Sequence, residues 1–232
     1  MDMMFLLGID SLFVFLVLPA LAFTLWAQFK VKSTFGKFSK ERTTNGITGA
    51  QAAREILVRE GLTDVRIEKI AGHLTDHFDP RDNTIRLSDS VHDAATVAAV
   101  GVAAHEVGHA IQHAHGYTPM KIRAAIIPVT MFGSRLAGPL FIAGIFLAGF
   151  GFLMDIAIIL FAAVVLFQLV TLPVEFNASN RAVAALETNA MLTSFEISSS
   201  KKVLTAAALT YVAALAMALV QLIRFIAIAR RR

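Results

Sequence analysis

The sequence contains no cysteine, one tryptophan, two tyrosines and few charged residues. Without cysteine, a disulfide framework and a thiolate zinc site are both excluded. Charged residues make up only 16% of the 232 residues, whereas hydrophobic residues make up 56%. This balance is too apolar for a soluble globular protein, and it indicates a chain built largely of membrane-spanning segments.

The basic residues do not form the stripe with interleaved aromatic residues that nucleic-acid binding requires, so nucleic acid is not expected as a partner. The formal net charge is +4, and many of the lysines stand close to the ends of apolar runs. The densest group follows the first run and comprises Lys30, Lys32, Lys37, Lys40 and Arg42. This group is typical of a membrane-flanking cluster, and the lipid bilayer is the expected partner.

Three apolar runs extend over residues 3–29, 136–174 and 203–229. As one helix, the middle run would be ~58 Å long, nearly twice the hydrocarbon thickness of a bilayer. Asp155 divides this run into two halves of 19 residues each. The sequence therefore predicts a helical hairpin with Asp155 at its tip, and about four transmembrane helices in all.

The first apolar run has an alternative interpretation as a cleaved signal peptide, because Ala20-Leu21-Ala22 resembles a cleavage site. The residues before it include Asp2 but neither lysine nor arginine, whereas signal peptides begin with basic residues. A retained N-terminal anchor is therefore the preferred prediction.

The polar region between the first two runs carries short periodic segments. Residues 48–61 are typical of an amphipathic helix that Thr48 caps and Gly61 ends. Residues 65–70 alternate like a strand, and segments 73–78 and 84–88 flank a turn-rich pentapeptide, which predicts a β-hairpin. The predicted fold class is α+β: a mainly α-helical multi-pass membrane protein with a small domain that contains a short β-sheet.

The motif His105-Glu106-Val107-Gly108-His109 follows this hairpin in an alanine- and valine-rich segment that favours a helix. Residues four apart lie on one helical face, so the two histidines can bind one Zn²⁺. Glu106 is then placed to act as the general base on a water molecule. The predicted helix begins with a cap at Ser88 or Ser90 and ends at Gly116.

A catalytic zinc takes three protein ligands, and two candidates compete for the third. His115 stands where the metzincin pattern HExxHxxGxxH has its third histidine, but Gln112 replaces the glycine on which that pattern turns. Glu175 instead follows the middle apolar run directly and is predicted to head a new helical segment. Glu187 and Glu196 are weaker candidates without such a context.

Membrane topology supports Glu175. The chain is predicted to cross the membrane twice between His109 and Glu175, so both residues lie on the same side. The alternative interpretation is that Glu175 is an interfacial carboxylate paired with Arg181.

The segment Glu175-Phe-Asn-Ala178-Ser179 resembles the ExxAD-type motif of membrane-embedded gluzincin peptidases, in which the glutamate binds zinc and the aspartate orients a ligand histidine. Ser179 replaces that aspartate here. Most of residues 48–190 is similar to the YugP-type family of neutral zinc metallopeptidases, through Asp76-His-Phe-Asp-Pro, Ile85-Arg-Leu-Ser, His105-Glu-Val-Gly-His-Ala-Ile-Gln-His-Ala114, Gly133-Ser-Arg and Leu172-Pro-Val-Glu-Phe-Asn-Ala-Ser. The resemblance implies a multi-pass bacterial membrane peptidase. It does not indicate which substrate the peptidase cleaves.

The leading hypothesis is a membrane-bound zinc endopeptidase that binds one Zn²⁺ per chain and hydrolyses a protein or peptide substrate. The expected zinc ligands are His105, His109 and Glu175, with Glu106 as general base. Candidates for oxyanion stabilisation or for contact with the ligands are His113, Tyr117, Ser179 and Arg181. A structural zinc in a non-catalytic membrane protein is the alternative, and an intramembrane metal transporter is disfavoured because the runs hold few ionisable residues.

The predicted organisation has five parts. They are an N-terminal transmembrane anchor (1–29), a small zincin-like catalytic region with the HExxH helix (30–123), the transmembrane hairpin (124–174), a helix with the third zinc ligand (175–202), and a C-terminal transmembrane helix with a basic tail (203–232). The hairpin at 73–88 is expected either to offer an edge strand to the substrate or to be an ordinary surface hairpin.

Nine lysines and arginines near the spans lie on the side of the predicted catalytic region, whereas the opposite side has Asp2 and Asp155. By the positive-inside rule the catalytic region faces the cytoplasm. A final crossing would then put Arg230, Arg231 and Arg232 outside, unless the last helix lies at the interface or re-enters.

Overall fold

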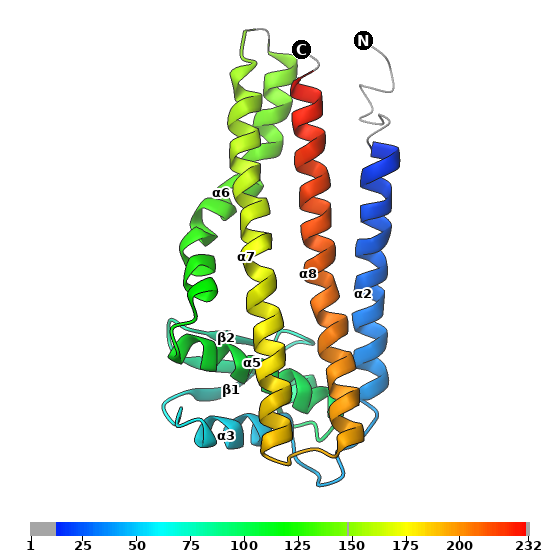
Figure 1. The fold of residues 1–232 in the computed structure, drawn as a ribbon, viewed down its shortest axis with the longest axis vertical. Coiled ribbons are helices and arrows are strands. Elements are labelled where there is room, and N and C mark those ends of the chain that lie inside the picture. The colour runs from blue at the N-terminus through cyan, green and yellow to red at the C-terminus, as the bar shows by residue number, and fades with distance from the viewer. Residues whose placement is uncertain (1–12, 148, 231–232) are drawn as a thin grey trace. The chain divides into compact units, whose positions relative to one another are not determined.

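The computed structural model describes residues 13–147 and 149–230 (Figure 1). The chain is mostly helical (74%), and its described residues include a small three-stranded mixed sheet, which confirms the predicted α+β membrane protein. It divides into two compact units. The described part of the first unit comprises residues 13–28, 121–172 and 210–230, and the second unit comprises residues 29–120 and 173–209.

Four helical segments of the described chain are long and apolar enough to cross a membrane. They are Phe13–Phe38, which consists of a π-helical turn and α2 (Leu18–Phe38), α6 (Thr118–Phe146), α7 (Phe152–Thr188) and α8 (Ser194–Ala229). The predicted number of spans is confirmed. Asp2, Arg231 and Arg232, which entered the prediction of topology, lie outside the described residues.

The tip of the transmembrane hairpin differs from the prediction. α6 ends at Phe146 and α7 begins at Phe152, so Asp155 lies in the first turn of α7 instead of at the tip. Gly149 in the connection has a φ of +83°, a backbone conformation that glycine adopts without steric cost. A carboxylate in the first turn is compatible with helix because the N-terminal end of the helix dipole is positive.

α7 is one continuous helix of 37 residues, and the predictions that Glu175 heads a new helix and that one helix extends over 175–202 are both wrong. Its length of ~55 Å exceeds the hydrocarbon thickness of a bilayer. The residues after Val174 are more polar than the run before them. They include several alanines, which are strong helix formers, so the helix continues. The break comes only at residues 189–193, before α8 begins at Ser194.

The first unit has a small apolar core made from the α6–α7 hairpin and the last part of α8. Its buried members are Ala137, Phe141, Met154, Ala157 and Phe225. The rings of Phe141 and Phe225 stack with centroids 4.1 Å apart. These contacts join the end of the chain to the hairpin.

The second unit contains the polar region of the sequence, and its first helix agrees with the prediction. α3 extends over Gly49–Arg59, and Thr48 and Gln51 form a capping box at its N-terminus. Such reciprocal hydrogen bonds satisfy two backbone N–H groups that the first turn leaves free. Gly61, with a φ of +73°, lies just after the end of the helix, as predicted.

The sheet has three strands in the order β1-β3-β2: β1 (Arg66–Ile70), β2 (His77–Asp79) and β3 (Thr84–Ser88). β2 and β3 form the predicted antiparallel hairpin, in which Phe78 pairs with Ile85. β1 pairs in parallel with the other side of β3. β3 is therefore the central strand, and β2 is the strand of the hairpin that lies at an edge of the sheet.

The helix that contains the HExxH motif is α5 (Val97–Ala114). Its N-terminal cap is Thr96, whose hydroxyl accepts a hydrogen bond from the Ala99 N–H, and the predicted caps at Ser88 and Ser90 are wrong. A separate short helix, α4 (Asp89–His92), lies between, and the Ser88 hydroxyl instead donates to Asp76. Gly116 follows the end of α5 with a φ of +63°, which confirms the predicted stop.

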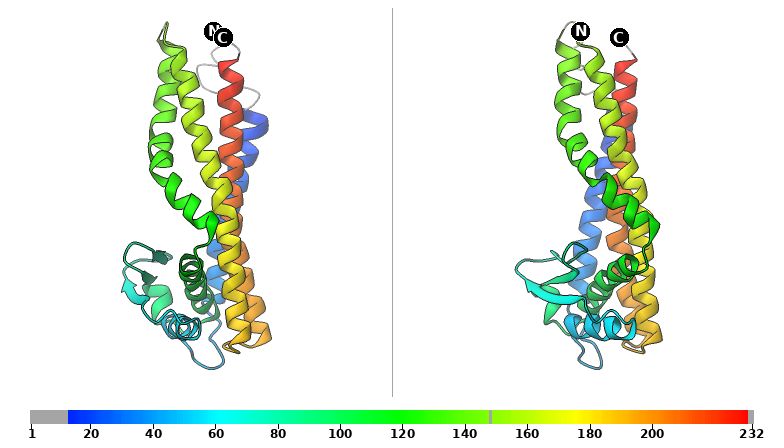
Figure 2. Two further views of the ribbon diagram at one scale, coloured as in Figure 1. Left: turned by 60° about the vertical axis from the view of Figure 1, so that its left-hand side comes forward. Right: turned by 90° about the vertical axis from the view of Figure 1, so that its left-hand side faces the viewer.

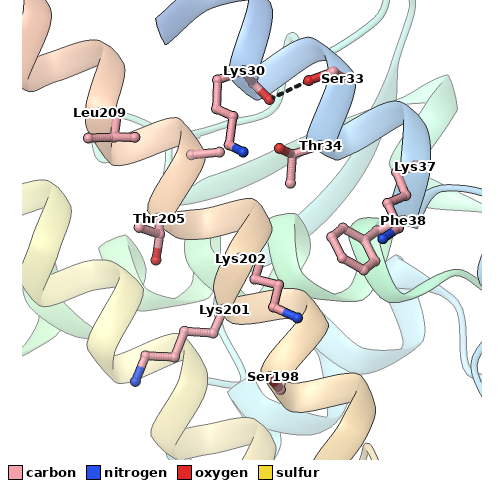
Figure 3. Close-up of a pocket in the computed structure, with 11 residues that line it drawn as sticks. Lys30, Ser33, Thr34, Lys37, Phe38, Ser198, Lys201, Lys202, Thr205 and Leu209 are labelled. Carbon is pink, nitrogen blue, oxygen red and sulfur yellow. Dashed lines mark hydrogen bonds between the residues drawn. The ribbon is translucent and has the colours of Figure 1, made fainter.

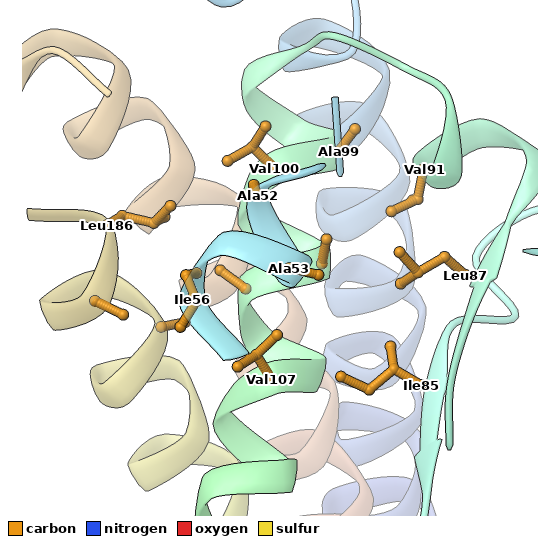
Figure 4. Close-up of a cluster of buried hydrophobic side chains, with 14 of the residues drawn as sticks. Ala52, Ala53, Ile56, Ile85, Leu87, Val91, Ala99, Val100, Val107 and Leu186 are labelled. Atoms are coloured by element: carbon orange, nitrogen blue, oxygen red, sulfur yellow. The ribbon is translucent and has the colours of Figure 1, made fainter. Parts of the chain in front are cut away.

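α5 lies between the sheet on one side and the segment of α7 after Pro173 on the other (Figure 2). The buried side chains of the second unit surround it, and Figure 4 shows the contributions of α3, the sheet, α5 and α7. Labelled members of this core are Ala52, Ala53, Ile56, Ile85, Leu87, Val91, Ala99, Val100, Val107 and Leu186. Small side chains on α3 and α5 let the two backbones approach closely.

Candidate metal centre

One group of side chains in the described chain could hold a metal ion, and it consists of His105, His109 and Glu175. The two histidines come from α5, and Glu175 comes from α7. One ligand atom from each residue lies within 4.8 Å of the others. These are the three residues that the sequence indicated as zinc ligands.

The spacing of the ligand atoms fits a zinc ion. Glu175 Oε2 lies 3.3 Å from His105 Nε2 and 3.6 Å from His109 Nε2. Zinc binds such atoms at ~2.0–2.2 Å in a tetrahedral arrangement, which places neighbouring ligand atoms ~3.3 Å apart. The two separations are also long for N–H···O hydrogen bonds, whose usual upper limit is about 3.2 Å. The donor set therefore suits zinc in both chemistry and spacing.

The other nitrogen of each imidazole has a polar neighbour. His105 Nδ1 lies 3.1 Å from the Ser179 hydroxyl oxygen, and His109 Nδ1 lies 3.0 Å from Gln112 Oε1. With Nδ1 engaged, Nε2 of each ring points toward Glu175. Histidines that bind zinc commonly have a hydrogen-bond partner at the second ring nitrogen, because that bond sets the orientation and the tautomer of the ring.

Gln112 connects the histidine pair to α7. Its amide nitrogen donates to the Val174 carbonyl oxygen at 2.8 Å and to Asn177 Oδ1 at 3.0 Å. Asn177 Oδ1 also accepts a hydrogen bond from Arg181 Nε at 2.8 Å. The Arg181 guanidinium thus has a hydrogen-bond partner other than Glu175. Gln112 is fully buried, so its hydrogen bonds to His109, Val174 and Asn177 are made in the protein interior.

Sequence reasoning missed the contributions of Gln112 and Asn177. Gln112 entered only as a departure from the metzincin pattern, although its place one turn after His109 was a usable signal. Asn177 stands two residues after Glu175, and the sequence shows nothing that distinguishes it from a surface asparagine.

Gly108 allows α5 and α7 to approach closely enough for the centre to form. A Cβ at this position would collide with the carbonyl oxygen of Ala178. Because a carbonyl oxygen belongs to the rigid backbone of α7, it cannot move aside as a side chain could. At Gly101, two turns earlier, an added Cβ would meet the side chain of Ser200 on α8, which, unlike the Ala178 carbonyl, can shift.

The centre is shielded from solvent and negatively charged. Glu175 is 2% exposed, Glu106 7% and His109 9%. Burial alone would lower the pKa of the His109 imidazole, but the neighbouring carboxylates of Glu175 and Glu106 outweigh it and hold that pKa above its ordinary value. The same negative field favours a cation in this position.

The remaining predicted candidates lie around the centre in different ways. The His113 ring is exposed and contacts the Phe78 ring of β2, with centroids 5.7 Å apart. The Tyr117 hydroxyl donates to the Pro173 carbonyl oxygen at 3.5 Å, two residues before Glu175. His115 is exposed at the C-terminal cap of α5 and is not part of the metal-binding group, so the metzincin alternative fails.

The weaker glutamate candidates have other surroundings. The Glu196 carboxylate accepts hydrogen bonds from the backbone N–H groups of Thr44 and Thr193, which ties the start of α8 to the segment after α2. Glu187 is exposed near the end of α7. Neither belongs to the metal-binding group.

Comparison with known proteins agrees with this centre. A family model described as "Putative neutral zinc metallopeptidase" matches residues 13–230. The chain is also 48% identical over 217 residues to "Putative membrane protease YugP" from Bacillus subtilis (strain 168), an alignment that covers 94% of this chain and 96% of the relative. No solved structure gives a significant match. The chain therefore belongs to the neutral zinc metallopeptidase family, as its own motifs had indicated.

Proposed function

We propose that this protein is a membrane-bound zinc endopeptidase whose metal ligands are His105, His109 and Glu175. The observation that carries the proposal is the convergence of these three side chains, from two helices, at spacings that suit one zinc ion. Glu106 follows His105 directly on α5, where a metal-activated hydrolase has its general base.

The chain's own residues have distinct roles in the proposed reaction. Zinc, when bound, would polarise the substrate carbonyl and lower the pKa of water to about 7. Glu106 takes the proton from the attacking water and then delivers it to the leaving amine. Ser179 and Gln112 keep the two imidazoles oriented toward the metal. His113, Tyr117 and Arg181 are the candidates for stabilising the oxyanion.

The alternative is a structural zinc in a membrane protein without catalytic activity. Glu106 argues against it, because a structural site has no use for a buried carboxylate next to a ligand. Metal analysis combined with cleavage of casein or a fluorogenic peptide separates the two possibilities. Stoichiometric zinc with no cleavage of any substrate tried would favour the alternative.

The substrate's docking strand is proposed to pair with β2, the edge strand of the sheet that packs on α5. β2 lies beside the C-terminal half of α5, where Phe78 contacts His113, one turn after His109. A substrate backbone added at this edge would be held by main-chain hydrogen bonds, which accept many sequences.

Binding of a zinc-chelating peptide inhibitor is therefore expected to slow amide hydrogen exchange at residues 77–79. Exchange in β3, which is already paired on both sides, should change little. Hydrogen exchange with mass spectrometry measures both segments in one experiment. Unchanged exchange at residues 77–79 in the saturated complex would rule out docking at this edge.

The metal centre is proposed to face the cytoplasm. Seven of the nine lysines and arginines that flank the spans belong to the second unit, whereas Asp155 lies in the first turn of α7, in the first unit. A cytoplasmic reporter such as green fluorescent protein, fused after Glu60 at the end of α3, is expected to be active. Activity of a periplasmic alkaline phosphatase at the same position would refute the assignment.

A further inference from the structure

A cavity of about 640 Å³ separates the last two turns of α2 from the first part of α8. Four of its lining residues are lysines: Lys30 and Lys37 from α2, and Lys201 and Lys202 from α8. In Figure 3, Lys30 and Lys202 extend from the two helices into the space between them. The cavity belongs entirely to the second unit, and it is separate from the metal-binding group.

The four lysines have no acidic neighbours in the cavity. No aspartate or glutamate lines it, and none of the ion pairs between described residues involves these lysines. Lys30 and Lys202 bring two ammonium groups into one space, where they repel each other, so an anion bound between them would relieve the repulsion. The cavity therefore has the charge of an anion-binding site.

Hydroxyl groups complement the lysines. Ser33 and Thr34 on α2, with Ser198 and Thr205 on α8, line the same cavity. The Thr34, Ser198 and Thr205 hydroxyls can donate hydrogen bonds to phosphate oxygens, whereas the Ser33 hydroxyl donates to the Lys30 carbonyl oxygen. The lining thus suits a group that has several oxygens and a negative charge.

The place of these lysines in their helices points to a membrane lipid. Lys30 directly follows the apolar run that ends at Phe29, and Lys202 directly precedes the run that begins at Val203. On each helix the cavity therefore lies at the boundary between apolar and polar sequence, where lipid headgroups are found. Apolar side chains of Phe38, Ala206 and Leu209 complete the lining.

We propose that this cavity binds the phosphate headgroup of an anionic phospholipid. The lysines and hydroxyls contact the headgroup, and the acyl chains continue along the apolar parts of the two helices. Basic pockets between transmembrane helices are known to bind such headgroups, and each lysine near an anionic surface strengthens binding about fivefold. The proposal does not depend on the peptidase activity.

The single tryptophan, Trp26, provides a local probe, because it lies one helical turn before Lys30 on α2 and is 48% exposed. The full-length protein is reconstituted into vesicles that mix phosphatidylcholine and phosphatidylglycerol, with brominated acyl chains on one lipid at a time. Quenching of Trp26 fluorescence then measures which lipid is preferred next to this site. We expect the wild type to prefer phosphatidylglycerol about tenfold.

Two pairs of substitutions each remove two positive charges from residues 30–40, which comprise the end of α2 and the two residues after it. Lys30→Gln with Lys37→Gln changes the cavity and should reduce the preference nearly to one. Lys32→Gln with Lys40→Gln changes exposed lysines outside the cavity and should leave the preference close to that of the wild type. Lys30→Arg with Lys37→Arg should restore most of it.

Equal losses of the phosphatidylglycerol preference in both double variants would indicate a general effect of surface charge and would overturn the proposal. A wild type without any preference for phosphatidylglycerol would also overturn it. Inorganic phosphate at 10 mM, roughly the concentration at which a free-phosphate site would fill, provides another arm. If it abolishes the preference, the site takes free phosphate and the lipid assignment is wrong. If the variant with Lys30→Gln and Lys37→Gln does not fold, Lys202→Gln is the second variant, and its preference for phosphatidylglycerol should fall about fivefold.

Discussion

Replacing Glu106 by glutamine is expected to abolish peptide hydrolysis while zinc stays bound. Glutamine has the same shape as glutamate but cannot accept a proton from water, and general-base catalysis contributes ~10²–10⁴-fold to such reactions. Because the substitution also disturbs the charge of a buried centre, we expect a loss of about 10³-fold or more. Zinc should remain because Glu106 is outside the group of three ligand atoms.

Initial rates with a fluorogenic peptide, together with zinc content per chain, measure the two effects separately. Glu175→Gln is the contrasting variant, since loss of a ligand should remove both the metal and the activity. Glu187→Gln, which neutralises an exposed carboxylate on the same helix, is the matched control and should behave as the wild type. Undiminished activity in Glu106→Gln would refute the proposed mechanism.

Replacing Gly108 by alanine is expected to destroy the metal centre although no ligand is changed. The added methyl group would collide with the backbone carbonyl of Ala178, so α5 and α7 must move apart. Overpacking of this kind costs ~1–3 kcal/mol of stability, and zinc sites tolerate shifts of only ~0.2 Å. We expect the zinc affinity to fall by about 100-fold or more, because loss of even one hydrogen-bond partner of a ligand costs ~10- to 100-fold and here the ligands move as well.

Zinc retained after dialysis against a zinc buffer, and thermal unfolding followed by circular dichroism, measure these losses. Gly36→Ala is the matched control, since Gly36 lies in α2 with no atom in the way of an added methyl group. At an open helical position alanine is favoured by ~0.5–1 kcal/mol, so this control should be at least as stable as the wild type. Normal zinc affinity in Gly108→Ala would show that the close approach of the helices is not required.

The local patterns of the sequence predicted the elements that depend on neighbouring residues. The number of apolar spans, the helix after Thr48, the hairpin and the helix around His105 all follow from periodicity and capping within a few residues. Predictions failed where two local signals competed. The charge of Asp155 predicts a break between the spans at that residue, whereas the glycine-containing segment before it ends the helix.

Local patterns in the sequence could not predict the order of the strands in the sheet. β1 pairs in parallel with β3, and β2 has only three residues. Both features depend on how the sheet packs on α5. The alternation of polar and apolar residues within a strand does not indicate which other strand it pairs with. For this reason the central position of β3 appeared only in the structure.

The sequence by itself determined the chemistry of this protein: two histidines four residues apart on a helix, a glutamate between them, and apolar runs that require a bilayer. Only the tertiary structure decided which distant groups complete the centre. Ser179 reaches His105 across 74 positions of the chain, and Gln112 reaches Val174 across 62. Such contacts depend on the close packing of α5 against α7, which Gly108 permits, and no local pattern of residues encodes the distance between two helices.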